Sequence, residues 1–152
     1  MRADQLSGPR HQKGAAAIEF AAVFVIFFGL FYALVSYSLP LLMMQSFNAA
    51  TSEAVRRSVA LSPNIGTATY NALVITQAQA TVQSQLSWMP PSLNLAASDI
   101  EVKFVAGLLT VSINYPKAKL TQVLPLLTLP VIGEVPRLPS VLSAQASLQL
   151  VP

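Results

Sequence analysis

The feature that most constrains this chain is a long stretch without charge. No charged residue occurs between Glu19 and Glu53. Its most apolar part runs from Phe20 to Leu39, and these residues would span about 30 Å as a helix, which is the thickness of a bilayer's hydrocarbon core. A core helix of a soluble protein is seldom so long and so apolar on every face. The stretch therefore predicts a transmembrane helix.

The flanks of this span predict its orientation. Arg2, Arg10 and Lys13 precede it, against the single acid Asp4. Lys and Arg near a span are retained in the cytoplasm, so we expect a cytoplasmic N-terminus and an exported remainder. A cleaved secretory signal is disfavoured, because its apolar region is shorter and ends in a small-residue cleavage site that is missing here.

Composition narrows the class of protein further. Hydrophobic residues make up 53% of the chain, charged residues 10%, and the net charge is only +3. These values exclude an intrinsically disordered chain, and they argue against a conventional soluble enzyme and against a nucleic-acid binder. The absence of Cys excludes a disulfide framework, a thiol nucleophile and a cysteine metal site.

One acid stands at the start of the apolar helix. A carboxylate at the position of Glu19 costs a few kcal/mol inside a membrane unless it is paired. It could simply flank the helix N-terminus, where the macrodipole favours negative charge. Its neighbours favour a function, because a basic leader ends at Gly14 and the sequence Gly-Ala-Ala-Ala-Ile-Glu-Phe follows, with Phe20 next to the acid.

This arrangement resembles the processing site of type IV prepilins. Together with the helix that follows, it is similar to the TadE-like minor pilin and pseudopilin family of the Tad/Flp type IVb pilus system. The resemblance implies that a prepilin peptidase cuts between Gly14 and Ala15 at the cytoplasmic side. It also implies that Glu19, with Phe20 beside it, is the charge used in processing or assembly. The implied partners are other pilins or pseudopilins and the inner-membrane assembly proteins of the Tad system.

Related families fit less well. General secretion pseudopilins usually have Phe-Thr-Leu-Ile-Glu after the glycine, whereas this chain has Ala15–Glu19 as Ala-Ala-Ala-Ile-Glu. The major Flp pilin is little more than one helix, whereas about a hundred residues follow the span here.

The exported part predicts two helical stretches. We expect the first helix to continue to Leu61, with a shared apolar face and a surface pair between Glu53 and Arg57. Pro and Gly in residues 62–66 predict a break. A second amphipathic helix is predicted from Ala68 to Trp88. The expected face of the first helix is Leu42, Phe47, Ala50, Ala54 and Leu61, and that of the second is Val74, Ala78, Val82 and Leu86.

Alternating apolar and polar residues then predict strands. Three such runs occur, and Ala106–Gly107 between the first two fits a tight hairpin. They indicate a small antiparallel sheet with one buried face. The predicted fold class is α+β, with a leader at 1–14, a membrane-spanning and extended helix at 15–61 and an exported domain at 62–152. The inward-facing residues are Ile100, Val102 and Phe104; Leu109, Val111, Ile113 and Tyr115; and Leu142, Ala144, Ala146, Leu148 and Leu150.

The segment Leu120–Gly133 is uncharged and rich in large aliphatic residues. Pro125 and Pro130 discourage a central strand. Two interpretations remain: a loop folded over the sheet, or an exposed apolar surface that contacts another subunit or the membrane.

The sequence predicts no catalysis, no cofactor and no metal site. The only histidine, His11, lies in the leader. Asp99 and Glu101 would share one strand face and are expected to be solvent-facing acids. Lys117 and Lys119 are expected at a solvated strand end, where they could also touch an acidic partner.

Two hypotheses for function follow. The first is a minor pilin or pseudopilin of a Tad/Flp-type pilus or its secretion machine, located in the bacterial inner membrane with a periplasmic C-terminal domain and possible incorporation into the fibre. The second is an unprocessed single-pass envelope anchor with a small partner-binding domain. Only the first requires cleavage after Gly14.

Overall fold

A computed structural model describes the chain except residues 1–11, 63, 65, 130–132 and 151–152. The described residues do not include Arg2, Asp4, Arg10 and His11 of the expected leader, nor Pro130. The chain divides into two compact units, Met1–Val35 and Ser36–Pro152.

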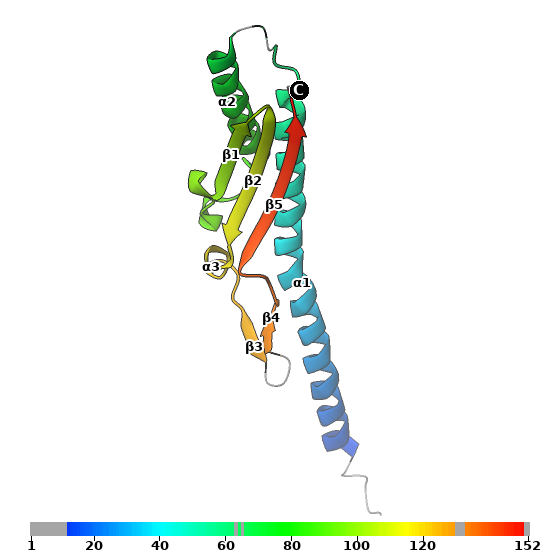
Figure 1. Cartoon of the computed structure of the whole chain (residues 1–152). Helices are drawn as coiled ribbons and strands as arrows, with labels where there is room; N and C mark the ends of the chain where they lie inside the picture. Colours follow the sequence, from blue (N-terminus) through cyan, green and yellow to red (C-terminus); the bar gives the residue numbers. More distant parts are fainter. Residues whose placement is uncertain (1–11, 63, 65, 130–132, 151–152) are drawn as a thin grey trace, which may run out of the picture. The chain divides into compact units, whose positions relative to one another are not determined.

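The described part of the first unit belongs to helix α1, which runs from Gln12 to Ser58 (Figure 1). Every residue from Gly14 to Phe31 is exposed. From Gly14 to Phe31, apolar side chains therefore cover the helix all round.

The remainder of α1, from Ser36 onward, belongs to the second unit and has a buried face. Met43, Phe47, Ala50 and Ala54 are completely buried. Their spacing of three or four residues is that of one helical stripe. The expected face was correct at Phe47, Ala50 and Ala54, but wrong at Leu42, which is 48% exposed, because Met43 instead of its neighbour lies on the stripe.

Helix α2, from Thr67 to Gln85, packs on the same core. It follows Gly66, whose φ of 88° favours glycine and ends the preceding segment. The predicted face is confirmed, because Val74, Ala78, Val82 and Leu86 are all buried. The helix stops before Trp88, and the short 3₁₀ helices η2 (Pro91–Leu93) and η3 (Ala97–Asp99) follow.

A three-stranded antiparallel sheet completes the core. Its strands are β1 (Ile100–Val105), β2 (Leu108–Pro116) and β5 (Val141–Gln149), in the order β1-β2-β5 (Figure 1). Ala106 and Gly107 form the hairpin turn, both with positive φ, as a two-residue turn of this kind needs. The sheet has one buried face, formed by Leu109, Val111, Ile113 and Tyr115 on β2 and Leu142 and Ala144 on β5.

The predicted α+β fold class is thus confirmed, and one strand position was wrong. Leu148, near the end of β5, is 38% exposed. It lies opposite the buried Leu109 in the register, but β5 is an edge strand of the three-stranded sheet, so its end has a neighbouring strand on one side only.

The segment after β2 contains more structure than predicted. It forms a short helix α3 (Lys117–Leu120) and a two-stranded ribbon of β3 (Leu127–Leu129) and β4 (Gly133–Val135). Leu120 is fully buried, whereas Val123 is 40% and Leu127 is 44% exposed. The segment is therefore buried at Leu120 and exposed farther on, and its contact with another subunit or the membrane stays a prediction.

Candidate functional site

The predicted cleavage site lies on the first turn of α1. Gly14 and Ala15 are both exposed and helical. A Cβ added to Gly14 would meet no atom within 4 Å. Nothing in the described chain therefore covers the peptide bond between them, and a larger residue at position 14 fits the chain's own structure.

Glu19 lies one helical turn beyond Ala15, on the same face of α1, because residues four apart face each other on a helix. Its side chain is exposed, and no hydrogen bond or ion pair joins it to another residue in the part of the chain whose side chains are described. A new amino terminus at Ala15 would lie close to a carboxylate that the described part of its own chain leaves unpaired.

Phe20 begins a row of aromatic rings along α1. Its ring centroid lies 6.0 Å from that of Phe24, and Phe24 lies 4.4 Å from Phe28. A second pair, Phe27 and Phe31, is stacked at 6.3 Å. This surface is apolar and exposed, so Glu19 stands at the edge of an aromatic helix face.

The helix meets the requirements of a membrane span. The best window in Gly14–Ser58 has a mean hydropathy of 2.4, and none of it is buried in the structure. A helix of this length and composition would need either lipid or other helices around it, since about 25 cal/mol is lost for each Å² of apolar surface left in water.

Several charged residues of the second unit form ion pairs with one another, and two of these pairs correct expectations from the sequence. Asp99 is only 8% exposed, and its carboxylate accepts hydrogen bonds from the Lys119 ammonium at 2.6 Å and from the Ala96 amide at 2.7 Å. Lys117 pairs with Glu134 at 2.6 Å. Asp99 is therefore not a solvent-facing acid, and neither lysine lies at a freely solvated strand end.

Other pairs agree with the sequence. Arg57 binds Glu53 at 2.6 Å as expected, and Arg56 binds the same carboxylate at 2.7 Å. These two hydrogen bonds lower the pKa of Glu53 to about 2. Glu101 pairs with Lys103 on the exposed face of β1. Within the described residues no group of three or more potential metal ligands comes together.

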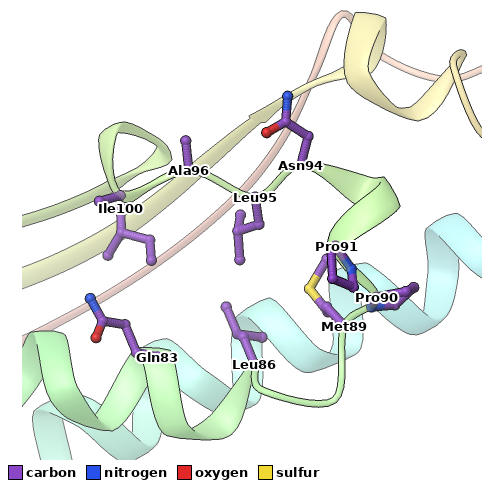
Figure 2. A pocket seen from close by; sticks show the side chains of 10 residues that line it. Gln83, Leu86, Met89, Pro90, Pro91, Asn94, Leu95, Ala96 and Ile100 are labelled. Carbon is purple, nitrogen blue, oxygen red and sulfur yellow. The ribbon is translucent and has the colours of Figure 1, made fainter.

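A surface pocket of about 420 Å³ lies between the end of α2 and the start of β1. Figure 2 shows Leu86 and Leu95 facing each other across it, with Gln83 and Ile100 at one side and Met89 near the other. No ionisable side chain lines it. The pocket therefore offers shape and a few amide groups but no acid–base chemistry.

Tyr115 was expected only as a core residue, and the structure adds a polar role. Its hydroxyl donates to the Leu93 carbonyl oxygen at 2.5 Å, and its ring lies 6.0 Å from Phe47. Burial, and secondarily the Asp99 carboxylate, raise the pKa of Tyr115. An aromatic residue with a hydroxyl on the inner face of a strand is the only signal that the sequence offered for this contact.

These features define a class of protein: one N-terminal apolar helix that fits a single-pass membrane anchor, followed by a small α+β unit. Residues 14–56 match the family of TadE-like proteins, which confirms the resemblance drawn from Gly14–Phe20. Over this segment the chain is TadE-like. The match ends within α1 and does not reach the sheet. No curated protein and no solved structure matches the chain.

Proposed function

We propose that this protein is a minor pilin or pseudopilin that is processed by a prepilin peptidase and then acts in assembly of a Tad/Flp-type pilus or its secretion machine. In this proposal the peptidase cuts between Gly14 and Ala15 at the cytoplasmic face of the inner membrane. The apolar part of α1 then holds the subunit in that membrane, and the second unit lies in the periplasm until the subunit joins or primes the fibre.

The observation that carries the proposal is the position of three residues on one exposed helix. Gly14 and Ala15 lie uncovered on the first turn, and Glu19 lies one turn later without a partner in the described chain. Cleavage would create an amino group at Ala15 that is cationic at neutral pH. Inside a membrane either charge alone is costly, so Glu19 and the amino terminus of the same or a neighbouring subunit stabilise each other.

The cleavage step can be tested with two matched glycine variants. A Cβ fits without contact at both Gly14 and Gly29, so Gly14→Val and Gly29→Val disturb the helix alike. We expect co-expression with a prepilin peptidase to give a product that begins at Ala15 in the wild type and in Gly29→Val, but not in Gly14→Val. Intact-mass analysis measures this. A wild-type product that begins at Met1 in the presence of active peptidase would reject the proposal and favour the unprocessed anchor.

The role of Glu19 can be separated from cleavage. Glu19→Gln keeps the size of the side chain and removes its charge, and Glu19→Ala removes both. If Glu19 pairs with an amino terminus during assembly, cells carrying either variant should lose surface pili while the subunit stays in the membrane fraction. Wild-type piliation with both variants would exclude the pairing role, even if the leader is still removed normally.

A further inference from the structure

The outer edge of β5 in the second unit has no neighbouring strand, because β5 pairs only with β2 in the order β1-β2-β5 (Figure 1). Two hydrogen bonds flank this ladder. At one end the Lys117 N–H donates to the Ser140 carbonyl, and at the other the Leu150 N–H donates to the Gly107 carbonyl. In an antiparallel pair, bonded residues alternate with residues whose backbone groups point away. The even-numbered residues of β5 therefore bond to β2, and the odd-numbered ones point outward.

Three of these outward residues have unpaired backbone groups. Within the described chain, no hydrogen bond joins the backbone N–H or C=O of Ser143, Gln145 or Ser147 to another group. All three residues are exposed, and each offers one donor and one acceptor at the spacing of a strand. A row of unpaired groups in this arrangement is a template for another extended backbone.

This edge also lacks the features that protect an exposed strand. Exposed edges are usually short, charged, or interrupted by proline or a bulge. β5 has nine residues, none of them charged or proline, and its pairing with β2 is continuous. The opposite edge of the sheet differs, since β1 has six residues and carries Glu101 and Lys103. β5 is therefore the edge that is better suited to pairing.

An apolar groove of about 330 Å³ lies beside the start of β5. Leu41 and Met44 of α1 line it together with Val141 and Leu142 of β5. In a strand added along β5, the residue opposite Leu142 would share its face of the sheet and would point toward this groove. Farther along the same face, Leu148 is 38% exposed. Apolar side chains at these two positions of an added strand would therefore remove apolar surface from water.

A second copy of the whole chain fits this edge poorly. Two β5 strands that pair through a twofold axis run antiparallel, and the same axis reverses the direction of α1. The two Ser36 ends of α1, to which the first units are joined, would then lie on opposite sides of the axis. Two chains anchored side by side in one membrane need these ends at the same side. A single extended segment has no such restriction.

We propose that the outer edge of β5 binds an extended segment of a partner protein, which adds to the sheet as a fourth strand. The segment is uncharged and alternating, with polar side chains opposite Ser143, Gln145 and Ser147 and apolar ones opposite Leu142 and Leu148. In this mode of recognition the backbone hydrogen bonds give affinity and the groove selects the side chain. The inference concerns the second unit alone and does not depend on cleavage after Gly14.

The test uses the full chain in detergent micelles and a capped, fluorescein-labelled nonapeptide with the sequence of Val141–Gln149. Residues 142–148 read the same in both directions. Antiparallel pairing centred on Gln145 therefore places a peptide leucine opposite both Leu142 and Leu148. We expect saturable binding, measured by fluorescence anisotropy. No binding up to the solubility limit of the peptide would overturn the inference.

Methylation of the peptide nitrogens distinguishes strand pairing from other binding and leaves the protein unchanged. Methyl groups at the peptide positions of Ser143, Gln145 and Ser147 remove the donors that face β5, and should weaken binding by about tenfold or more. Methyl groups at the positions of Ala144 and Ala146 lie on the far edge of the peptide and should leave binding unchanged. Equal effects of the two patterns would contradict pairing along the β5 edge.

A proline in β5 tests the same edge from the side of the protein. Gln145→Pro removes an outward N–H and keeps the bonds to β2, because proline is tolerated where the N–H of an edge strand faces solvent. Val102→Pro is the matched control, since Val102 lies opposite Val111, whose backbone groups bond to β5, and so also points outward. Only Gln145→Pro should lose peptide binding. Normal binding to Gln145→Pro, with protected β2 amides showing that it is folded, would refute the proposal.

The groove and the identity of the occupant have separate readouts. Replacing the peptide leucine opposite Leu142 by alanine should weaken binding about tenfold, and an unchanged affinity would exclude the groove from the binding site. Sedimentation of the full chain in micelles tests the occupant. Self-association that Gln145→Pro abolishes would assign the edge to a second copy and overturn the partner segment, whereas a monomeric chain that binds the peptide supports it.

Discussion

Replacing Tyr115 by phenylalanine tests the central polar contact of the second unit. Tyr115 is completely buried, and its hydroxyl donates to the Leu93 carbonyl at 2.5 Å. The variant keeps the ring and its packing on Phe47, but it leaves the carbonyl of Leu93, a residue only 1% exposed, without this donor. A buried acceptor that loses its partner costs about 2 kcal/mol, so we expect the midpoint of thermal unfolding to fall by roughly 8 °C.

The matched control is Tyr70→Phe. Tyr70 is also buried, at 6% exposure, and also packs on an aromatic ring, Phe104 at 5.9 Å. Its hydroxyl makes no hydrogen bond within the described chain and is not a buried unsatisfied group. Its loss should therefore cost less than about 0.5 kcal/mol. Unfolding of the full chain in detergent micelles, followed by Trp88 fluorescence, measures both. Equal losses for the two variants would falsify the assignment of stability to the Tyr115 hydroxyl.

The same residue predicts a dependence on pH. Burial, and to a lesser degree the Asp99 carboxylate, raise the pKa of Tyr115 above its ordinary value of 10.0. The folded state therefore keeps the proton when the unfolded state has lost it. This contribution to stability is fully present below about pH 10 and is lost as the pH rises through the higher folded value. Tyr115→Phe should lack this alkaline loss, which unfolding midpoints between neutral and strongly alkaline pH would show.

Three further predictions concern α1 and the ribbon of β3 and β4. In the same unfolding assay, Met43→Ala should lower the free energy of unfolding by about 3 kcal/mol and Leu42→Ala by about 1 kcal/mol, because only Met43 is fully buried. The opposite order would contradict the finding that Met43, and not Leu42, lies on the buried face of α1. Hydrogen bonds from Arg56 and Arg57 lower the pKa of Glu53 to about 2. The contribution of these two ion pairs to the stability of the end of α1 should therefore be present above about pH 4.5 and be lost toward pH 2. The protection factors of amides near the end of α1, which correct for the intrinsic pH dependence of exchange, should then fall in acid, and in Glu53→Gln they should be low at every pH. Glu134→Gln releases Lys117 and should accelerate exchange in the β3–β4 ribbon with no change in the β2–β5 pairing; unchanged ribbon exchange would count against a holding role for this ion pair.

The sequence predicted the long elements well, because their periodicity is a local property. Val74, Ala78, Val82 and Leu86 on α2 repeat at helical spacing, and the four inward residues of β2 alternate with polar ones. The phase of α1 near Leu42 could not be predicted, because Leu41, Leu42, Met43 and Met44 are all apolar and a helix can bury any of them. Only packing in the hydrophobic core of the second unit selects Met43.

The ion pairs that join distant parts of the second unit could not be predicted from the sequence for a different reason. Lys119 and Asp99 are 20 positions apart, and Lys117 and Glu134 are 17 apart. No local pattern links such residues. The elements that bring them together, α3 and the β3–β4 ribbon, have only three or four residues per element and are too short for a periodic signal. At the candidate site, Gly14, Ala15 and Glu19 stay a prediction from the sequence, to which the structure adds that all three are exposed.

The distribution of ion pairs separates the two units in a way that bears on assembly. All four acids of the second unit, Glu53, Asp99, Glu101 and Glu134, have a basic partner in their own chain. Glu19 has none in the described part of the chain, and it stands in the most apolar surroundings. A charge that is already paired gains little from a new partner in water, whereas an unpaired charge in a medium of low dielectric constant gains most. If the protein assembles as proposed, the electrostatic free energy of the acidic residues for binding another subunit would therefore be concentrated at Glu19. The second unit would then contribute through apolar contacts and neutral hydrogen bonds, and charge reversal at its paired acids should affect folding more than partner choice.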